Sequence, residues 1–177
     1  MRIAITGTPG CGKSSLSNSL NLEFNFIEVE EIAKKYECFT PSTNENESAI
    51  VDVEELVKKL LIEWSQPPKE STIITGHLSH LLPVDAIIIL RCNPLKLKLR
   101  LENRNWNQDK INSNVECELL GGPWGDLIGC EMPPCLELDN TSADLDNLST
   151  QIIGWIAEGT PSNEGTPPID WIAKLHE

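Results

Sequence analysis

Residues 1–16 read Met1-Arg-Ile-Ala-Ile-Thr-Gly-Thr-Pro-Gly-Cys-Gly-Lys-Ser-Ser-Leu16 and carry the clearest structural signal in the chain. The apolar run Ile3 to Ile5 is typical of a buried strand, and a helix-compatible segment from Ser14 to Leu22 follows the glycines. Between them, Gly7 to Ser14 match the pattern G-x-x-x-x-G-K-[ST]. Strand, loop and helix in this order are the context in which the pattern forms a phosphate-binding P-loop.

The residue types of this loop explain how it would bind phosphate. Glycines 7, 10 and 12 allow backbone N–H groups to turn toward one anion, and the following helix points its positive end at the same place. Lys13 can reach the outer phosphates, and the Ser14 hydroxyl can coordinate Mg²⁺. We therefore predict that the protein binds a nucleoside triphosphate.

Composition restricts the possible partners. The formal charge of −13 and the pI near 4.6 argue against independent binding to nucleic acid, because like charges repel phosphate backbones. An acidic surface can attract a basic protein. It can equally serve solubility or adaptation to a salty cytoplasm, and the sequence leaves these readings open.

Other features of the chain bear on its cellular location. No charged and apolar leader precedes the first strand, and no apolar run approaches the length of a membrane span. We expect a cytoplasmic protein that does not contact a membrane. Six cysteines lack the paired spacing of a zinc site, so we expect reduced thiols.

Strands alternate with helices along the rest of the chain, which predicts an α/β fold with a parallel sheet and nucleotide at the carboxyl ends of its strands. The expected strands are residues 3–5, 24–29, 72–75, 85–90 and 136–138. The expected helices are residues 14–22, 30–36, 52–65, 94–101, 114–120 and 143–157. Residues 37–50, 103–113 and 121–135 are expected to be loops, and residues 169–173 to form an apolar turn that docks back.

One segment is ambiguous on its own. Residues 95–101, Leu-Lys-Leu-Lys-Leu-Arg-Leu, alternate with the period of a strand. Asn93 is a good helix N-cap and Pro94 suits the first helical position. A parallel strand must also be followed by a crossover, so we predict a helix here.

Several segments together resemble one family. They are Gly-Thr-Pro-Gly-Cys-Gly-Lys-Ser-Ser (7–15), Val-Glu-Glu-Ile-Ala-Lys-Lys-Tyr (29–36), Gly76-His77, Leu90-Arg91 and Glu-Asn-Arg-Asn-Trp (102–106). The chain is similar to the small adenylate kinases of the archaeal and nuclear type, known as the adenylate kinase isoenzyme 6 family. The resemblance covers residues 1–120 and 136–157, and leaves out residues 121–135 and the tail after residue 159.

The resemblance implies a single P-loop NTPase domain over residues 1–177, of the nucleoside monophosphate kinase type, with a five-stranded parallel sheet in the order 2-3-1-4-5. Residues 28–51 would bind the monophosphate, residues 103–113 would form a short lid, and residues 159–177 are a C-terminal tail. ATP would be held, with Mg²⁺ at Ser14, by the residues Gly10, Gly12, Lys13, Ser14, Ser15 and Arg104.

The family also implies what the protein does. ATP and AMP would give two ADP, with additional ATPase activity. The family assists late maturation of the small ribosomal subunit, including processing of its RNA, by transient binding of the eleventh small-subunit ribosomal protein. The alternative is an assembly factor that ATP switches and that has little AMP kinase activity.

The residues agree with phosphoryl transfer, which needs positioning and positive charge around the moving group. Lys13 would supply one charge and Arg104, from a closing lid, another. Arg91 and Arg100 are placed to reinforce them, although a helix-surface position would leave Arg100 in solvent. His77 is a further catalytic candidate, with a purely structural histidine as the alternative.

Two positions depart from the family pattern. Thr75 stands where a Walker-B carboxylate should end the third strand, which leaves Ser14 as the clear protein ligand for Mg²⁺. Residues 28–51 contain no arginine, and lysine replaces the bidentate grip of arginine on phosphate poorly. The sequence therefore predicts monophosphate kinase activity that is weak or broad in specificity.

Overall fold

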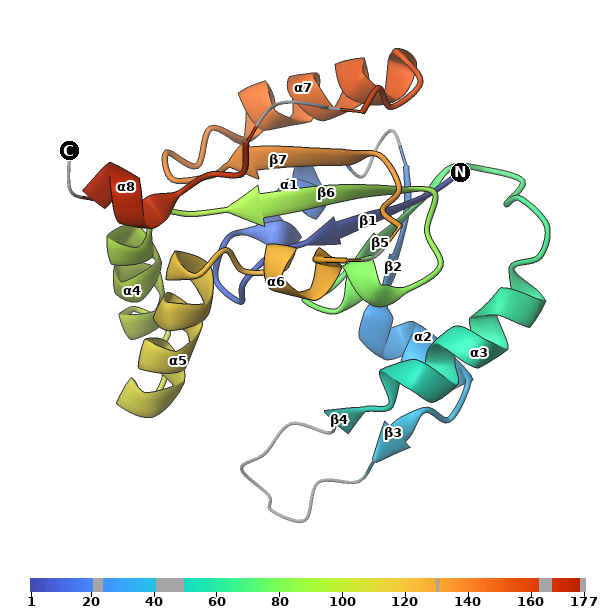
Figure 1. Cartoon of the computed structure of the whole chain (residues 1–177), viewed down its shortest axis with the longest axis horizontal. Helices are drawn as coiled ribbons and strands as arrows, with labels where there is room; N and C mark the ends of the chain where they lie inside the picture. Colours follow the sequence, from blue (N-terminus) through green and yellow to red (C-terminus); the bar gives the residue numbers. More distant parts are fainter. Residues whose placement is uncertain (21–23, 41–49, 130, 163–166, 176–177) are drawn as a thin grey trace.

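Five parallel strands form the centre of the molecule. The computed structural model describes residues 1–20, 24–40, 50–129, 131–162 and 167–175 (Figure 1). The sheet order is β2 (Asn25–Glu28), β5 (Thr72–Thr75), β1 (Arg2–Thr6), β6 (Ala86–Arg91) and β7 (Cys135–Asp139). Counted along the chain, these central strands follow the order 2-3-1-4-5, so both the predicted parallel sheet and its order are confirmed.

Helices cover both faces of this sheet, as the apolar strands require. Ile3 and Ile5 of β1 pack against α1 (Lys13–Leu20) and α7 (Leu145–Ala157) on one face. Ala4 points to the other face, where α6 (Trp124–Leu127) packs. All six residues of β6 are buried, because a central parallel strand has no solvent-facing side.

A second core lies beside the sheet, between α2 (Val29–Lys35) and α3 (Val53–Glu63) (Figure 1). These helices flank a short antiparallel pair, β3 (Phe39–Thr40) and β4 (Ile50–Val51). The loop expected over residues 37–50 thus contains strand at both ends, and its residues 41–49 lie outside the described residues. Asp52 caps α3 by accepting from the Glu55 backbone N–H at 3.0 Å.

The ambiguous leucine-rich segment is a helix, α4 (Pro94–Glu102). The Asn93 side chain caps it by accepting from the backbone N–H of Leu95 at 2.9 Å. Helical spacing buries Leu97 and Leu101 completely, whereas Leu99 is 54% exposed. A strand would have placed all three of these leucines on the same face.

The polar excursion is shorter than we predicted. Helix α5 (Gln108–Leu119) begins at residue 108 and not at 114, because the Asn107 side chain caps it by accepting from the Lys110 N–H at 2.8 Å. Ile111 on the inner side of this helix packs against α4. The expected loop over residues 121–135 likewise contains the short helix α6.

The C-terminal segment docks back onto the domain, as the apolar turn at 169–173 predicted. It ends in α8 (Trp171–Leu175), which lies near α4 at the carboxyl end of the sheet (Figure 1). A single-turn 3-10 helix, η1 (Ser79–Leu81), follows β5. In the described part of the chain, we find no helix with the length and apolar character that crossing a bilayer requires.

Candidate functional site

The P-loop joins β1 to α1 at the carboxyl end of the sheet, where α/β proteins bind nucleotides. Its shape leaves no room for a Cβ at its glycines, as Gly7 and Gly12 show. Gly7 has a φ of +143°, and a Cβ there would lie 2.3 Å from the Leu90 carbonyl oxygen. Gly12 has a φ of +102°, and a Cβ there would lie 2.3 Å from Asn140 Nδ2. Close packing against β6 and against Asn140, the residue after β7 (Cys135–Asp139), therefore holds the loop in this shape.

The Lys13 side chain turns back toward the P-loop and contacts its backbone. Its Nζ donates to the Gly7 carbonyl oxygen at 2.6 Å and to the Thr8 carbonyl oxygen at 3.3 Å. Burial lowers the pKa of Lys13 from 10.5 to about 8, and the positive charge of Arg104 contributes in the same direction. The ammonium group is thus charged at neutral pH and poorly solvated, which favours an anion as its partner.

A cavity of about 590 Å³ opens beside the P-loop. Lys13, Ser14 and Pro9 line it from the P-loop, and described residues of β2, α2, β4 and α3 form much of the rest of its wall. The remaining lining residues are Glu28, Val29, Glu30, Ile50, Val51, Val53, Thr75, Gly76, His77 and Leu78. Of the described residues that line it, Lys13 is the one with a cationic side chain.

The structure brings His77 to the same cavity as Lys13 and Ser14, as expected from its place after β5. Burial and the charge of Lys13 lower the pKa of His77 below its usual value. The imidazole is therefore neutral at pH 7 and can both donate and accept a hydrogen bond. His80, three residues later in η1, is structural: it is buried and contacts Thr6 Oγ1 at 2.8 Å.

The residues around Ser14 suit a magnesium ion. Thr75 ends β5 at the Walker-B position, and Glu28 ends β2 directly beside it in the sheet. Both residues line a hollow that Ser14 also lines. Hydroxyl and carboxylate oxygens are the ligands that Mg²⁺ takes from proteins, often with only one carboxylate. These residues therefore fit the ion, and Glu28 offers the carboxylate that Thr75 lacks.

Arg104 lies in the turn after α4 and is exposed. It does not line the cavity, although its charge acts on Lys13. The P-loop residues Gly10, Gly12, Lys13, Ser14 and Ser15 are all at the junction of loop and helix α1. His77 thus lines the same cavity as the P-loop residues Lys13 and Ser14, whereas Arg104 is not among its lining residues, and the catalytic roles of all these residues stay predictions.

Two arginines have roles that differ from our expectation. Arg91 is fully buried and paired with Glu118 at 2.8 Å and Glu137 at 2.7 Å, so it offers no charge to a phosphate. Arg100 is half-buried and does not line the cavity. It donates to the backbone carbonyls of Cys11 at 3.5 Å and Asn140 at 2.8 Å and thereby ties the P-loop to the end of β7.

The cysteines behave as predicted where they can be seen. Cysteines 11, 38, 92, 117 and 135 are free thiols, and Cys130 lies outside the described residues. Burial and the nearby Glu118 raise the pKa of Cys11 well above its usual value. The thiol inside the P-loop is therefore neutral and unreactive.

The chain matches a known family model and several named relatives. Residues 3–121 match the model of a family described as AAA domain. A protein of Methanocaldococcus jannaschii named "Putative adenylate kinase" is 37% identical over 180 residues, covering 100% of this chain and 96% of the relative. A protein of Archaeoglobus fulgidus with the same name is 34% identical, covering 100% and 95%.

Solved structures share the fold at low sequence identity. A sugar kinase from Janibacter has a TM-score of 0.57 at 17% identity, covering 88% of this chain and 94% of that one. A gluconokinase from Sinorhizobium meliloti has a TM-score of 0.52 at 17% identity, covering 90% and 93%. The sheet order, the P-loop and these neighbours define a P-loop kinase fold.

The two archaeal relatives, which match over the whole of this chain, assign it to a family within this fold. The chain belongs to the family of archaeal-type adenylate kinases, the family that its P-loop and flanking segments resemble.

Proposed function

We propose that the protein is a nucleoside monophosphate kinase that transfers the terminal phosphate of ATP to AMP and also hydrolyses ATP. One observation carries the proposal: the same cavity is lined by Lys13 and Ser14 of the P-loop and by described residues of β2, α2, β4 and α3. A phosphate donor at the loop and an acceptor in the cavity would meet there. The names of the archaeal relatives support AMP as the acceptor.

The residues of the site would divide the work of transfer. The bond from the γ-phosphorus to the bridging oxygen breaks, a bond to an AMP phosphate oxygen forms, and two ADP result. The N–H groups of the P-loop and Lys13 would hold the β- and γ-phosphates. Mg²⁺, held through Ser14 with Glu28 nearby, would neutralise charge on the phosphate oxygens. Arg104 would approach from the segment 103–113 as a lid.

His77 would act on the nucleophile. Its neutral imidazole lines the same cavity as Lys13 and would orient either the AMP phosphate or, in its absence, a water molecule. The same position therefore serves transfer and hydrolysis. This gives one physical route by which a kinase site also consumes ATP without an acceptor.

The decisive experiment measures ADP formation from Mg-ATP with and without AMP. Acceleration by AMP with two ADP formed per ATP supports the kinase, and an unchanged rate contradicts it. Lys13→Ala should lower either activity by about 100-fold or more, the scale of one lost charge-stabilising group. Lys69→Ala removes an exposed lysine far from the cavity and is the matched control.

A second function deserves a test because of the charges around the cavity. Its described lining holds Glu28 and Glu30 but no arginine, a poor setting for the phosphate of AMP. The formal charge of −13 favours a basic partner. An ATP-switched assembly factor for the small ribosomal subunit, with the eleventh small-subunit ribosomal protein as partner, would retain that protein on an immobilised sample in an ATP-sensitive way. Retention that ignores ATP would contradict it.

A further inference from the structure

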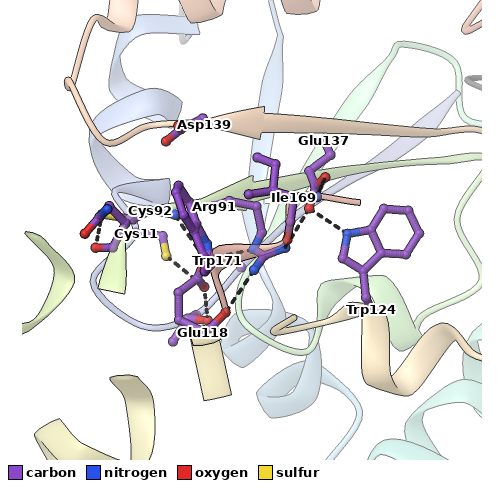
Figure 2. A network of polar contacts seen from close by, with 12 residues as sticks. Cys11, Arg91, Cys92, Glu118, Trp124, Glu137, Asp139, Ile169 and Trp171 are labelled. Atoms are coloured by element: carbon purple, nitrogen blue, oxygen red, sulfur yellow. Dashed lines mark hydrogen bonds and ion pairs between the residues drawn. The ribbon is translucent and has the colours of Figure 1, made fainter. Parts of the chain in front are cut away.

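One carboxylate outside the cavity contacts three distant parts of the chain. Glu118, in the last turn of α5, is fully buried. Figure 2 shows its polar partners. The phosphate-transfer chemistry described above does not use it. A buried carboxylate is costly unless the fold supplies hydrogen-bond donors to its oxygens, so its partners indicate its purpose.

The first group of donors belongs to the P-loop. Glu118 Oε2 accepts from the Thr8 hydroxyl at 2.5 Å and from the Cys11 thiol at 3.5 Å. The Thr8 carbonyl oxygen in turn accepts from the Cys11 N–H at 3.1 Å and from Lys13 Nζ at 3.3 Å. Glu118 therefore binds the P-loop turn from Thr8 to Cys11, the part of the backbone that would surround the phosphates.

The second group of donors meets at the other carboxylate oxygen. Glu118 Oε1 accepts from Arg91 Nε at 2.8 Å, from the Cys92 N–H at 3.1 Å and from the Trp171 indole N–H at 3.0 Å. Trp171 is the first residue of α8 and is only 3% exposed. The C-terminal helix thus supplies one of the groups that satisfy this carboxylate.

The C-terminal segment, residues 167–175, is attached to the same network at a second residue. The Ile169 N–H donates to Glu137 Oε2 at 2.7 Å, and its carbonyl oxygen accepts from Arg91 Nη1 at 3.4 Å (Figure 2). A five-residue helix near a chain terminus is stable only when tertiary contacts hold it. The network that shapes the P-loop is therefore also what orders this segment.

We propose that Glu118 is a positioning residue for the P-loop, and that the C-terminal segment completes this positioning through Trp171, so that its docking strengthens nucleotide binding. When the segment leaves, Glu118 Oε1 loses a donor and gains access to water. The carboxylate can then move away from Thr8, and the loop loses the bond that holds its first turn. Linkage requires the reverse as well: bound nucleotide strengthens docking.

The first test compares two tryptophans of the same network. Trp171→Phe removes the N–H donor to Glu118, whereas Trp124→Phe removes a donor to Glu137 at 2.7 Å and leaves Glu118 untouched. Titration with Mg-ATP should give a Kd raised about fivefold in Trp171→Phe, the lower end of coupling between sites, and unchanged in Trp124→Phe. An unchanged Kd in both folded variants overturns the proposal.

A double-mutant cycle separates positioning from general destabilisation. Thr8→Val removes the hydroxyl that Glu118 accepts from and keeps the shape of the side chain. If Trp171 acts through Glu118, the double variant Thr8→Val with Trp171→Phe binds Mg-ATP more tightly than the product of the two single effects predicts. Independent, multiplying effects would show that Trp171 merely supports the fold.

A third measurement needs no variant and so does not depend on folding of a mutant. Backbone hydrogen exchange of residues 171–175 should slow when Mg-ATP binds the wild-type protein, and unchanged exchange contradicts the proposal. The inference rests on the proposed binding of ATP at the P-loop. Failure of the wild type to bind Mg-ATP would overturn that function, whereas binding without any effect on the segment overturns only this inference.

Discussion

Lys13 combines a partly buried position with a required positive charge. Two carbonyl oxygens hold its ammonium group while burial lowers its pKa to about 8. Phosphate oxygens would replace neutral carbonyls by charged partners. Binding of ATP would therefore raise the pKa of Lys13 again.

This linkage predicts how ATP affinity depends on pH. Because the pKa in the free protein is about 8, Lys13 is charged below that pH and loses its proton above it. The Kd for Mg-ATP should be constant from about pH 7 to pH 7.5 and rise toward tenfold per pH unit above about pH 8.5, as uptake of one proton requires.

Calorimetric titrations across this range in buffers of different ionisation enthalpy would measure both the Kd and the proton uptake. Lys13→Arg is the matched control, because a guanidinium group stays charged throughout and should show no such rise if it binds at all. A flat profile for the wild type up to about pH 9.5 would contradict the assignment of Lys13.

Arg91 shows the limit of reasoning from residue type. An arginine at the end of an apolar strand beside a P-loop suggests a phosphate contact. In the structure, burial opposes its charge, but Glu118 and Glu137 more than compensate and raise the pKa of Arg91. The Arg91 charge is neutralised by two buried ion pairs, and only the positions of Glu118 and Glu137 in the fold show that it is unavailable to a phosphate.

At the scale of elements, α4 packs directly against the P-loop and so helps to hold its shape. A Cβ on Gly10 would lie 2.7 Å from Leu97 Cδ1 and 2.8 Å from Leu101 Cδ2, so the loop rests on this helix. The helix itself depends on its cap at Asn93 and on one buried stripe. The alternating leucine pattern is thus a helix with an apolar side and two further leucines in solvent.

We predict that Leu97→Ala and Leu99→Ala differ strongly although they are two residues apart. Leu97 is completely buried, so its truncation should lower the free energy of unfolding by about 2–5 kcal/mol. Leu99 is largely exposed, and its truncation should cost less than about 0.5 kcal/mol. Urea denaturation followed by circular dichroism measures both. Equal losses would mean that the segment does not form this helix.

At the scale of the whole molecule, the ion pairs fall into two kinds, exposed and buried, that respond differently to salt. The formal charge is −13, and the described ion pairs of α3 and α2, Lys35–Glu63, Lys58–Glu55 and Lys59–Glu55, are exposed and weak. The buried pairs of Arg91 are screened little by salt. Most of the electrostatic effect of salt should therefore come from repulsion between surface carboxylates.

We predict that sodium chloride stabilises the protein. Raising it from about 0.1 M to about 1 M shortens the Debye length from about 10 Å to about 3 Å. The free energy of unfolding should rise by on the order of 1 kcal/mol, the scale of surface electrostatics. The measurement uses urea, which is uncharged, and avoids sulfate, which stabilises by exclusion and could occupy the P-loop. A loss of stability would show that surface attraction dominates.

The sequence by itself determined the P-loop, the five-strand sheet order through its family resemblance, and the placement of His77 after its strand. The P-loop and the strand before His77 depend on neighbouring residues or short motifs, so their physical causes are local: glycine conformations, caps and apolar periodicity. The sheet order is a long-range property, and only the family resemblance supplied it. The start of α5 was missed because Asn107 was not recognised as its cap.

Tertiary structure alone decided the roles of Arg91, Glu118 and Trp171. Glu118 is separated by 27 residues from Arg91 and by 53 from Trp171, and each type usually lies on the surface or in an ordinary core. Only folding brings them together, where low solvent access forces each polar group to find a partner. That network joins the P-loop to the C-terminal helix, and no pattern of spacing along the chain encodes it.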